Sequence, residues 1–277
     1  MLTPKTLALP AYPPSKPEEA QAQVEELVAL HLEGKIQAGL VASSWSGEGL
    51  VLGFYEAYRE GARWRRITGG PSYKATGATG YAGLVFASED LGEVAEIASR
   101  LAECIGGEAW GVTRIGPPQL AAGVVEVLGG FTPDTAVACV QEELFGVRLE
   151  AKSVGLKSTE RISKAYAAKG WVHYTGAVEM PFVGRVERGD YWVRMGIAVT
   201  GDGFISNARI DGVFHAAPPN EPYNLVNAVL GMPAGEQALD LFEARSNLVE
   251  VWGLERSDLV EALARAIDAS SKGLDDE

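Results

Sequence analysis

The sequence is poor in cysteine and histidine, and each shortage excludes a class of site. Its 277 residues include two cysteines, Cys104 and Cys139, and three histidines. Two cysteines cannot supply a disulfide framework or a four-cysteine zinc site. We therefore expect a reducing compartment, with both cysteines serving as packing residues in helices. Three histidines far apart in the sequence give little support for a histidine-rich metal centre, and we predict no metal ligands.

Long hydrophobic runs are also missing. No apolar segment approaches the roughly 20 residues that span a bilayer, and the first residues lack the apolar core of a signal peptide. These absences predict a soluble, cytoplasmic protein with no membrane partner. The composition, with 47% hydrophobic residues, is enough for a sizeable core in about two domains.

Positive charge is scarce overall. The chain has 24 Lys and Arg against 37 Asp and Glu, a formal charge of −13, which argues against general nucleic-acid binding because that function needs a positive face. Two basic segments, residues 59–74 and 148–169, stand out from this acidic background. They favour a localised anionic ligand such as a phosphate; two solvated basic loops are the alternative.

Strand and helix patterns occur in blocks without a regular βαβ rhythm, which predicts an α+β fold. Ser15 to Glu18 fits a capping box for a first helix that ends at Gly34. Further helices are expected over residues 88–105, 117–128, 134–145, 223–230, 234–244 and 258–267. Strands are expected over residues 40–45, 50–54, 64–67, 81–86, 171–173, 177–186, 191–199 and 204–210, with a hairpin turn at residues 200–203. A domain boundary is expected between residues 1–186 and 187–277.

Common catalytic signatures are absent, including G-x-S-x-G, the P-loop and H-E-x-x-H. What remains is Arg65-Arg66-Ile67-Thr68-Gly69-Gly70, a pair of bases at a strand end followed by a glycine turn. Glycines let backbone N–H groups approach a ligand, and guanidinium groups bind phosphate oxygens. An ordinary turn beside surface arginines is the alternative.

The stretch RRITGGPSYKATGATGYAGLVF resembles the arginine-glycine motif of the lipoate-protein ligase family. Five residues match that motif: Arg65, Arg66, Thr68, Gly69 and Gly70. Pro71 stands in place of a third glycine, and Lys74 stands about where the family often has histidine. Residues 191–267 are similar to the accessory domain of the larger ligases.

A second family motif, K-[IV]-x-G-x-[AS], resembles Arg161 to Tyr166. Arg161 falls at the position of the family's lysine, and Lys164 falls at the position of its glycine. The resemblance thus implies catalytic roles for Lys164 and Arg161, with Lys157 as another candidate lysine. The following GWVHYTGAV includes His173, which we expect to pack in a strand or to support the site.

The resemblance implies the biotin/lipoate ligase catalytic fold, a mixed or antiparallel sheet with flanking helices, for residues 1–186, and a small α/β accessory domain for residues 187–277. It also implies that ATP and Mg²⁺ activate lipoate to lipoyl-adenylate. A lysine of a lipoyl carrier domain, of the 2-oxoacid dehydrogenase E2 or glycine-cleavage H protein type, then accepts the lipoyl group. The ligand-binding residues implied are Arg65, Arg66, Thr68, Gly69, Gly70, Tyr73, Lys74 and His173, and an acyl pocket would be lined by Trp45, Leu52 and Tyr81. An octanoyl or lipoyl transferase and a catalytically silent acyl- or nucleotide-binding paralogue are the alternatives.

Overall fold

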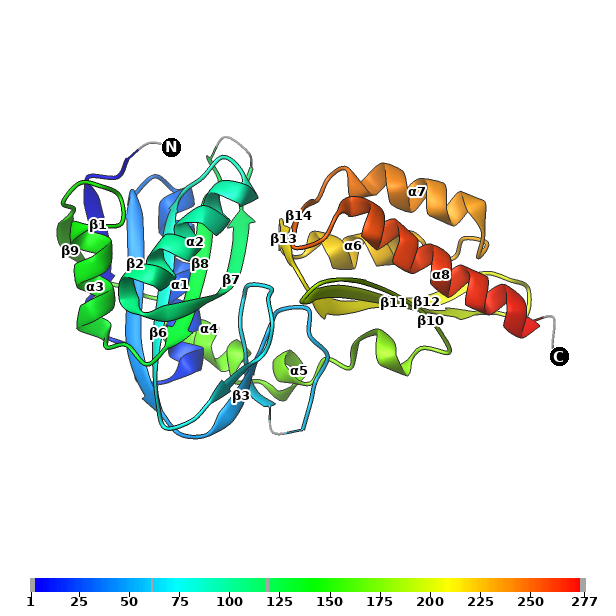
Figure 1. The fold of residues 1–277 in the computed structure, drawn as a ribbon, viewed down its shortest axis with the longest axis horizontal. Coiled ribbons are helices and arrows are strands. Elements are labelled where there is room, and N and C mark those ends of the chain that lie inside the picture. The colour runs from blue at the N-terminus through cyan, green and yellow to red at the C-terminus, as the bar shows by residue number, and fades with distance from the viewer. Residues whose placement is uncertain (1–2, 61, 118–119, 275–277) are drawn as a thin grey trace. The chain divides into compact units, whose positions relative to one another are not determined.

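The computed structural model describes residues 3–60, 62–117 and 120–274 and has the predicted α+β architecture (Figure 1). The chain forms two compact units. The first unit comprises residues 1–54 and 59–172, and the second comprises residues 55–58 and 173–277. None of the helices in the described part of the chain has the length and apolarity needed to cross a membrane.

A six-stranded mixed sheet forms the centre of the first unit, in the order β7-β8-β6-β2-β1-β9. Strand β1 pairs in parallel with β2 and β9, whereas the β2–β6, β6–β8 and β7–β8 pairs are antiparallel. The strands are β1 (Thr6–Pro10), β2 (Ala38–Ser46), β6 (Ala78–Ala87), β7 (Gly107–Ile115), β8 (Ala122–Gly129) and β9 (Glu150–Val154).

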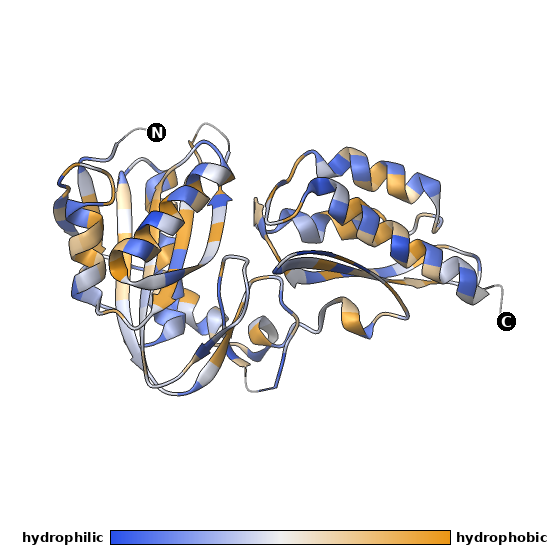
Figure 2. Cartoon of the chain, in the orientation of Figure 1, coloured by the Kyte–Doolittle hydropathy of each residue, from blue (hydrophilic) through white to orange (hydrophobic). Residues whose placement is uncertain are grey.

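Helices cover both faces of this sheet. Figure 1 shows α2 (Leu91–Ile105) and α3 (Pro133–Glu142) in front of it and α1 (Pro17–Leu32) behind. Gly83 lets α1 approach closely, because a Cβ there would lie 2.4 Å from a methyl group of Val24. Hydrophilic and hydrophobic residues alternate along α2 (Figure 2), as expected for a helix with one face on a core.

The ends of α2 are those predicted from its capping residues, whereas the capping interaction before α1 involves a different glutamate from the one predicted. Helix α2 starts after Asp90, whose carboxylate accepts the Glu93 N–H at 2.8 Å, and ends at Gly106, whose φ of 65° is left-handed. Before α1, Ser15 does form side-chain bonds of the capping-box kind, but its backbone N–H and hydroxyl donate to Glu19 at 2.9 Å rather than to Glu18.

The helix predicted over residues 117–128, of which residues 118–119 lie outside the described part of the chain, is wrong. Residues 122–129 form strand β8, and the preceding strand β7 was not predicted. Strand β8 pairs on both sides and is buried on both faces. Its apolar run therefore lacks the polar alternation that marks a half-exposed strand, and periodicity alone cannot separate such a strand from a buried helix.

Residues 171–186 also differ from the prediction. In place of a strand over residues 171–173, Trp171 and Val172 end the short helix α5 (Lys169–Val172). The strand expected over residues 177–186 is divided into a 3-10 turn, Gly176–Glu179, and strand β10 (Phe182–Arg188). The helix α4 (Thr159–Tyr166) was not predicted, because it has only 8 residues and one buried side chain, Ile162, which is too short a stretch for helical periodicity to stand out.

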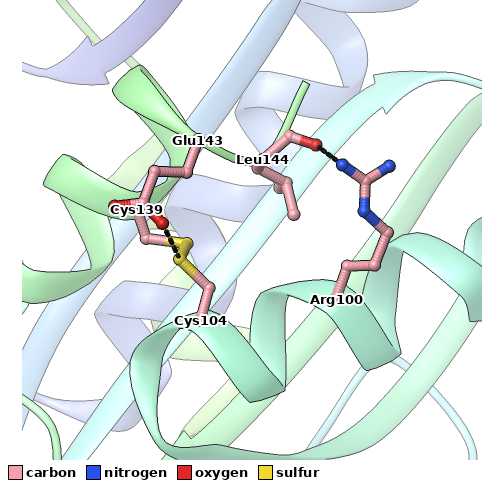
Figure 3. Close-up of a disulfide and its surroundings, with 5 residues drawn as sticks. All are labelled: Arg100, Cys104, Cys139, Glu143 and Leu144. Carbon is pink, nitrogen blue, oxygen red and sulfur yellow. Dashed lines mark hydrogen bonds between the residues drawn. A yellow bond between two sulfur atoms is a disulfide. The ribbon is translucent and has the colours of Figure 1, made fainter. Parts of the chain in front are cut away.

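The two cysteines form a disulfide, which corrects the expectation of two independent packing residues. Cys104 near the end of α2 and Cys139 in α3 have Cα atoms 6.1 Å apart, and Figure 3 shows the bond joining the two helices. Disulfides persist mainly in oxidising compartments, so this bond also removes the argument for a reducing compartment.

A second, three-stranded sheet in the first unit has the order β4-β3-β5. Strand β3 (Gly49–Leu52) pairs in parallel with β4 (Ala62–Arg65) and antiparallel with β5 (Tyr73–Ala75). The arginine-glycine turn follows β4 directly, so this small sheet determines where the candidate site lies.

The second unit contains an antiparallel sheet, β10-β11-β12, with the predicted hairpin between β11 (Tyr191–Val199) and β12 (Ile205–Val213). Its other elements are β13 (His215–Ala217), β14 (Glu250–Trp252), α6 (Glu221–Ala228), α7 (Glu236–Ser246) and α8 (Arg256–Leu274). Residues 173–186, which the sequence analysis gave to the first domain, lie in this unit because β10 pairs along its whole length with β11. Tyr55 also belongs here and stacks on Phe214 at 4.3 Å.

Candidate functional site

The arginine-glycine turn is hydrogen-bonded to the chain that leaves β3. The Arg66 N–H donates to the Leu52 carbonyl at 3.0 Å, and the Phe54 N–H donates to the Thr68 carbonyl at 2.9 Å. Arg65 ends β4, and residues 66–70 follow it as a buried turn. The strand end and the turn are thus held in one conformation by the adjacent backbone.

Two glycines outside the motif, Gly53 just after β3 and Gly111 in β7, allow the turn to lie inside the fold. A Cβ on Gly53 would lie 2.0 Å from the Gly70 carbonyl oxygen, and a Cβ on Gly111 of β7 would lie 1.7 Å from Thr68 Oγ1. Gly70 itself has a φ of 101°, which favours glycine. The turn therefore needs glycine at three positions, two of them outside the motif.

Glu126, in the middle of β8, lies under the turn. Its Oε2 accepts the Thr68 backbone N–H at 3.2 Å and the Thr68 hydroxyl, and its Oε1 accepts the Tyr81 hydroxyl at 2.7 Å. The side chain is fully buried. Burial raises the pKa of this carboxyl, while the positive charge of Arg66 and the hydrogen bonds from Thr68 and Tyr81 act in the opposite direction.

Both arginines of the motif are buried, with exposed fractions of 4% for Arg65 and 1% for Arg66. An Nη of Arg65 donates to the Val172 carbonyl at 3.3 Å, and the Trp171 indole donates to the Arg65 carbonyl at 3.1 Å. The Arg66 guanidinium donates to the Pro71 carbonyl and lies 6.0 Å from the centre of the Trp110 ring. The alternative of surface arginines beside an ordinary turn is therefore wrong.

Aromatic side chains surround the motif. Tyr73 meets Trp110 edge-on at 5.3 Å, and Trp171 contacts both Phe54, at 5.6 Å, and Tyr166, at 5.1 Å. The three residues expected to line an acyl pocket, Trp45, Leu52 and Tyr81, are buried in the core. An apolar chain ending in a polar group is the kind of ligand that such surroundings suit.

The second group of predicted site residues, Arg161 and Lys164, lies on the exposed helix α4. Lys164 in α4 has a side chain 74% exposed, and its Nζ pairs with Glu160 at 3.0 Å. Arg161 is exposed and lines a groove of about 420 Å³ together with Lys157, Glu25 and other residues of α1 and 155–162. The partner of Lys164 is thus a residue of its own helix.

The remaining predicted ligand-binding residues are divided between the units. Tyr73 is half-buried and Lys74 is exposed, both on β5. His173 belongs to the second unit, where it is exposed and stacks on Tyr58 at 4.2 Å. In the basic segment 148–169, Arg148 and Lys152 form exposed ion pairs with Glu142 and Glu150, so these bases do not form an isolated positive patch.

Glu126, Gly53 and Gly111 are the residues of the site that sequence reasoning missed. Glu126 lies in the segment that was wrongly predicted as a helix. In an amphipathic helix, an acidic residue is expected on the solvent-exposed face, so Glu126 was not considered as a buried site residue. One signal in the sequence could have identified it. Residues 124–127 are three valines and one glutamate, which favours a buried strand, and a charged residue in a buried strand needs polar partners.

Across the described ranges, no three acidic, cysteine or histidine side chains come together as potential metal ligands. Because Mg²⁺ is held by few protein groups plus substrate phosphates, the predicted Mg²⁺ would need the phosphates of ATP as partners. The described residues therefore do not make up a metal site by themselves.

We expect Gly111→Ala to destabilise the protein by about 1–3 kcal/mol, as overpacking typically does. The new methyl group would displace Thr68 and so break its bonds to Glu126. Urea denaturation measures the change. Gly130→Ala is the matched control, because a Cβ there meets no atom within 4 Å; an equal loss in both variants would contradict the tight contact at Gly111.

No protein-family model matches the sequence, and no curated protein matches it. The similarity that does exist is structural. LipL1 of P. falciparum, solved in complex with lipoate, superimposes with a TM-score of 0.59 at 9% identity, covering 86% of this chain and 93% of that one.

Two further solved structures match 61% of this chain each. One is a bi-partite lipoate protein ligase of Thermoplasma acidophilum, described together with its E2 lipoyl domain (TM-score 0.41, 11% identity, 96% of that chain). The other is lipoate-protein ligase A bound with ATP (TM-score 0.43, 10% identity, 98% of that chain). At these identities the likeness is one of fold, and the likeness to LipL1 extends over both units. The chain thus has the α+β fold of the lipoate-protein ligases.

Proposed function

We propose that this protein is a lipoate-protein ligase-like enzyme, which attaches lipoate or a similar acyl chain to a lysine of a lipoyl carrier domain. The observation that carries the proposal is the buried turn Arg65 to Gly70, which this fold holds between β3 and β7 with its backbone amides and two guanidinium groups among aromatic side chains. Such a turn suits a ligand that combines an apolar chain with an acyl head and a phosphate.

The proposed reaction has two steps. A carboxylate oxygen of lipoate attacks the α-phosphorus of ATP and pyrophosphate leaves; the carrier's lysine amine then attacks the acyl carbonyl and AMP leaves. Neither step needs a nucleophile from the protein. The roles left to the chain are to hold carboxylate and phosphate in line, to stabilise developing charge with Arg65 and Arg66, and to exclude water with the surrounding aromatic residues.

The carrier and the compartment belong to the same proposal. A lipoyl domain of the 2-oxoacid dehydrogenase E2 or H protein type is the acceptor we infer, by analogy with the archaeal ligase described with its E2 lipoyl domain. A cytoplasmic location stays part of the proposal, and the Cys104–Cys139 disulfide is the observation that weighs against it.

A transferase or a catalytically silent binding protein is the second candidate. It is favoured by the position of Lys164 in an exposed ion pair with Glu160, because an acyl-adenylate-forming enzyme is expected to hold a lysine against its ligand. A transferase would take the acyl group from a carrier thioester and need no ATP.

One assay separates these candidates. The protein is incubated with a lipoyl domain, lipoate and Mg²⁺-ATP, or with an octanoyl or lipoyl carrier protein and no ATP, and the domain is weighed by mass spectrometry. A lipoyl mass increase that depends on ATP supports the ligase, and an increase without ATP supports the transferase. Binding of lipoate by calorimetry with no mass increase in either reaction supports the silent protein, and neither binding nor modification would reject the proposal.

We expect Arg65→Ala to weaken ATP binding at least tenfold, because a buried, charge-assisted contact to phosphate contributes roughly 1.5–3 kcal/mol. Lys164→Met is expected to change the affinity less than about twofold, since an exposed ion pair contributes little. Calorimetry with both variants tests this contrast, with circular dichroism as the check on folding. A larger loss in Lys164→Met than in Arg65→Ala would move the phosphate site to α4.

A further inference from the structure

The two sulfur atoms of the disulfide Cys104–Cys139, which the proposed reaction does not use, differ in their access to solvent. Cys104 lies near the end of α2 and is half-buried, whereas Cys139 in α3 is only 4% exposed. Thiol–disulfide exchange requires a thiolate to reach one of the two sulfur atoms. A reagent from solvent can therefore approach this bond from the side of Cys104.

A cavity of about 320 Å³ opens at Cys104. Its walls are Arg100, Glu103 and Cys104 of α2, together with Glu143 and Leu144 directly after α3. Figure 3 shows Arg100 and Cys104 on one helix, with Glu143 and Leu144 facing them. Cys139 does not line the cavity, so a small thiol can dock against Cys104 while Cys139 stays buried.

Acidic side chains outnumber basic ones at this cavity. Glu103 and Glu143 are both exposed acidic residues, and Arg100, which also donates to the Leu144 carbonyl, is the one base among the lining residues. A carboxylate oxygen of Glu143 lies 3.6 Å from the sulfur of Cys104. The C-terminal end of α2 adds the negative pole of the helix dipole. The cavity therefore disfavours a further anionic group on an incoming thiol and favours a cationic one.

We propose that Cys104 is a thiolation site, at which a small cationic or uncharged thiol exchanges with the Cys104–Cys139 disulfide. The incoming thiolate attacks the Sγ of Cys104 and bonds to it. The bond between Cys104 and Cys139 breaks, and Cys139 leaves as a thiolate that takes a proton from water.

A second thiol completes the exchange. It attacks the sulfur of the attached thiol and releases Cys104, so that two thiols are oxidised to one disulfide and the protein disulfide is reduced to two thiols. The covalent link between α2 and α3 thus responds to the thiols around the protein. This inference does not depend on the proposed function, because neither step of that reaction uses a cysteine.

The first test identifies the sulfur that is attacked. The oxidised full-length protein is incubated briefly with excess cysteamine, a cationic thiol, and then unfolded in acidic guanidinium with N-ethylmaleimide, and its peptides are mapped by mass spectrometry. We expect cysteamine on Cys104 and maleimide on Cys139 at least about tenfold more often than the reverse, because access decides which sulfur reacts. Exchange through global unfolding would label both cysteines equally and would overturn the inference.

The second test measures the preference for charge. Exchange rates with cysteamine and with the anionic thiol 3-mercaptopropionate are compared at low salt, each divided by the rate of the same thiol with the uncharged 2-hydroxyethyl disulfide. We expect the protein to favour cysteamine by at least about threefold. Glu143→Gln should reduce this preference to less than about twofold, whereas the matched control Glu243→Gln, at an exposed position on α7, should leave it unchanged.

Two further results would contradict the inference. If 3-mercaptopropionate exchanges as fast as cysteamine on this relative scale, the charges at the cavity do not select the thiol, and the proposed class of ligand is wrong. If cysteamine is found mainly on Cys139, the cavity is not the point of entry. Both results come from the unmodified protein, so they count whether or not Glu143→Gln folds.

Discussion

Arg66→Met is expected to lower the free energy of unfolding by about 3–5 kcal/mol, the cost of removing one partner from a buried charge pair. Arg66 is 1% exposed, donates to the Pro71 carbonyl and supplies the positive charge that faces Glu126. Without it, the fully buried Glu126 carboxyl would lose the positive charge that opposes the effect of burial on its pKa, and the turn would lose its bond to Pro71. Urea denaturation, with the midpoint and slope both fitted, measures the loss.

A double variant isolates the charge effect. In Arg66→Met/Glu126→Gln both charges are gone, so we expect it to recover at least about 1–2 kcal/mol of the loss, because replacing both partners is often close to neutral. Arg63→Met, at an exposed position on β4, is the control for a lost arginine and should change stability by less than about 0.5 kcal/mol. A loss below about 1 kcal/mol in Arg66→Met would show that Glu126 is compensated by other groups.

Cys104→Ser/Cys139→Ser should destabilise the protein by about 3–4 kcal/mol, the loop-closure entropy for a disulfide that spans 35 residues. The bond joins α2 and α3, which cover the face of the sheet opposite Glu126, so its loss should act on folding rather than on ligand contacts. Urea denaturation with and without a reducing agent measures this contribution.

The reducing agent provides the internal control for the disulfide. It should lower the stability of the unmodified protein to nearly that of the double serine variant, and it should leave the variant itself unchanged. Equal stability with and without reductant would mean that the two cysteines are not bonded in solution, and the expectation of a reducing compartment would return.

Local signals were sufficient for much of the fold. The N-cap at Asp90, the glycine stop at Gly106 and the Thr200 to Gly203 turn each involve neighbours in sequence, and the elements that they bound were predicted correctly. Strand β8 was missed because it is buried between β6, which is remote in sequence, and β7, which was itself not predicted. Where both faces of an element are buried, the pattern of polar residues no longer tells a strand from a helix.

In the candidate site, too, the local features could be predicted and the contacts between distant residues could not. Arg65 to Gly70 could be identified because charge and glycine are concentrated in six consecutive residues. The contacts of Glu126 with Thr68 and Tyr81 span 58 and 45 residues, and no local pattern indicates a pairing over such distances. Similarly, glycine is needed at residues 53 and 111 because Gly70 and Thr68 lie against them in the folded chain. A single sequence does not reveal these contacts.

The second unit is not one continuous stretch of the chain, because it includes Tyr55 to Tyr58 as well as residues 173–277. The backbone passes from one unit to the other after Phe54, returns at Arg59, and crosses again after Val172. Cleaving the single bond after Val172 therefore cannot release two complete halves, because the segment 55–58 stays covalently part of the N-terminal fragment. A truncation that ends at Val172 would also leave Tyr55 without the Phe214 ring on which it stacks, so such a fragment would expose an aromatic side chain that is buried in the intact chain.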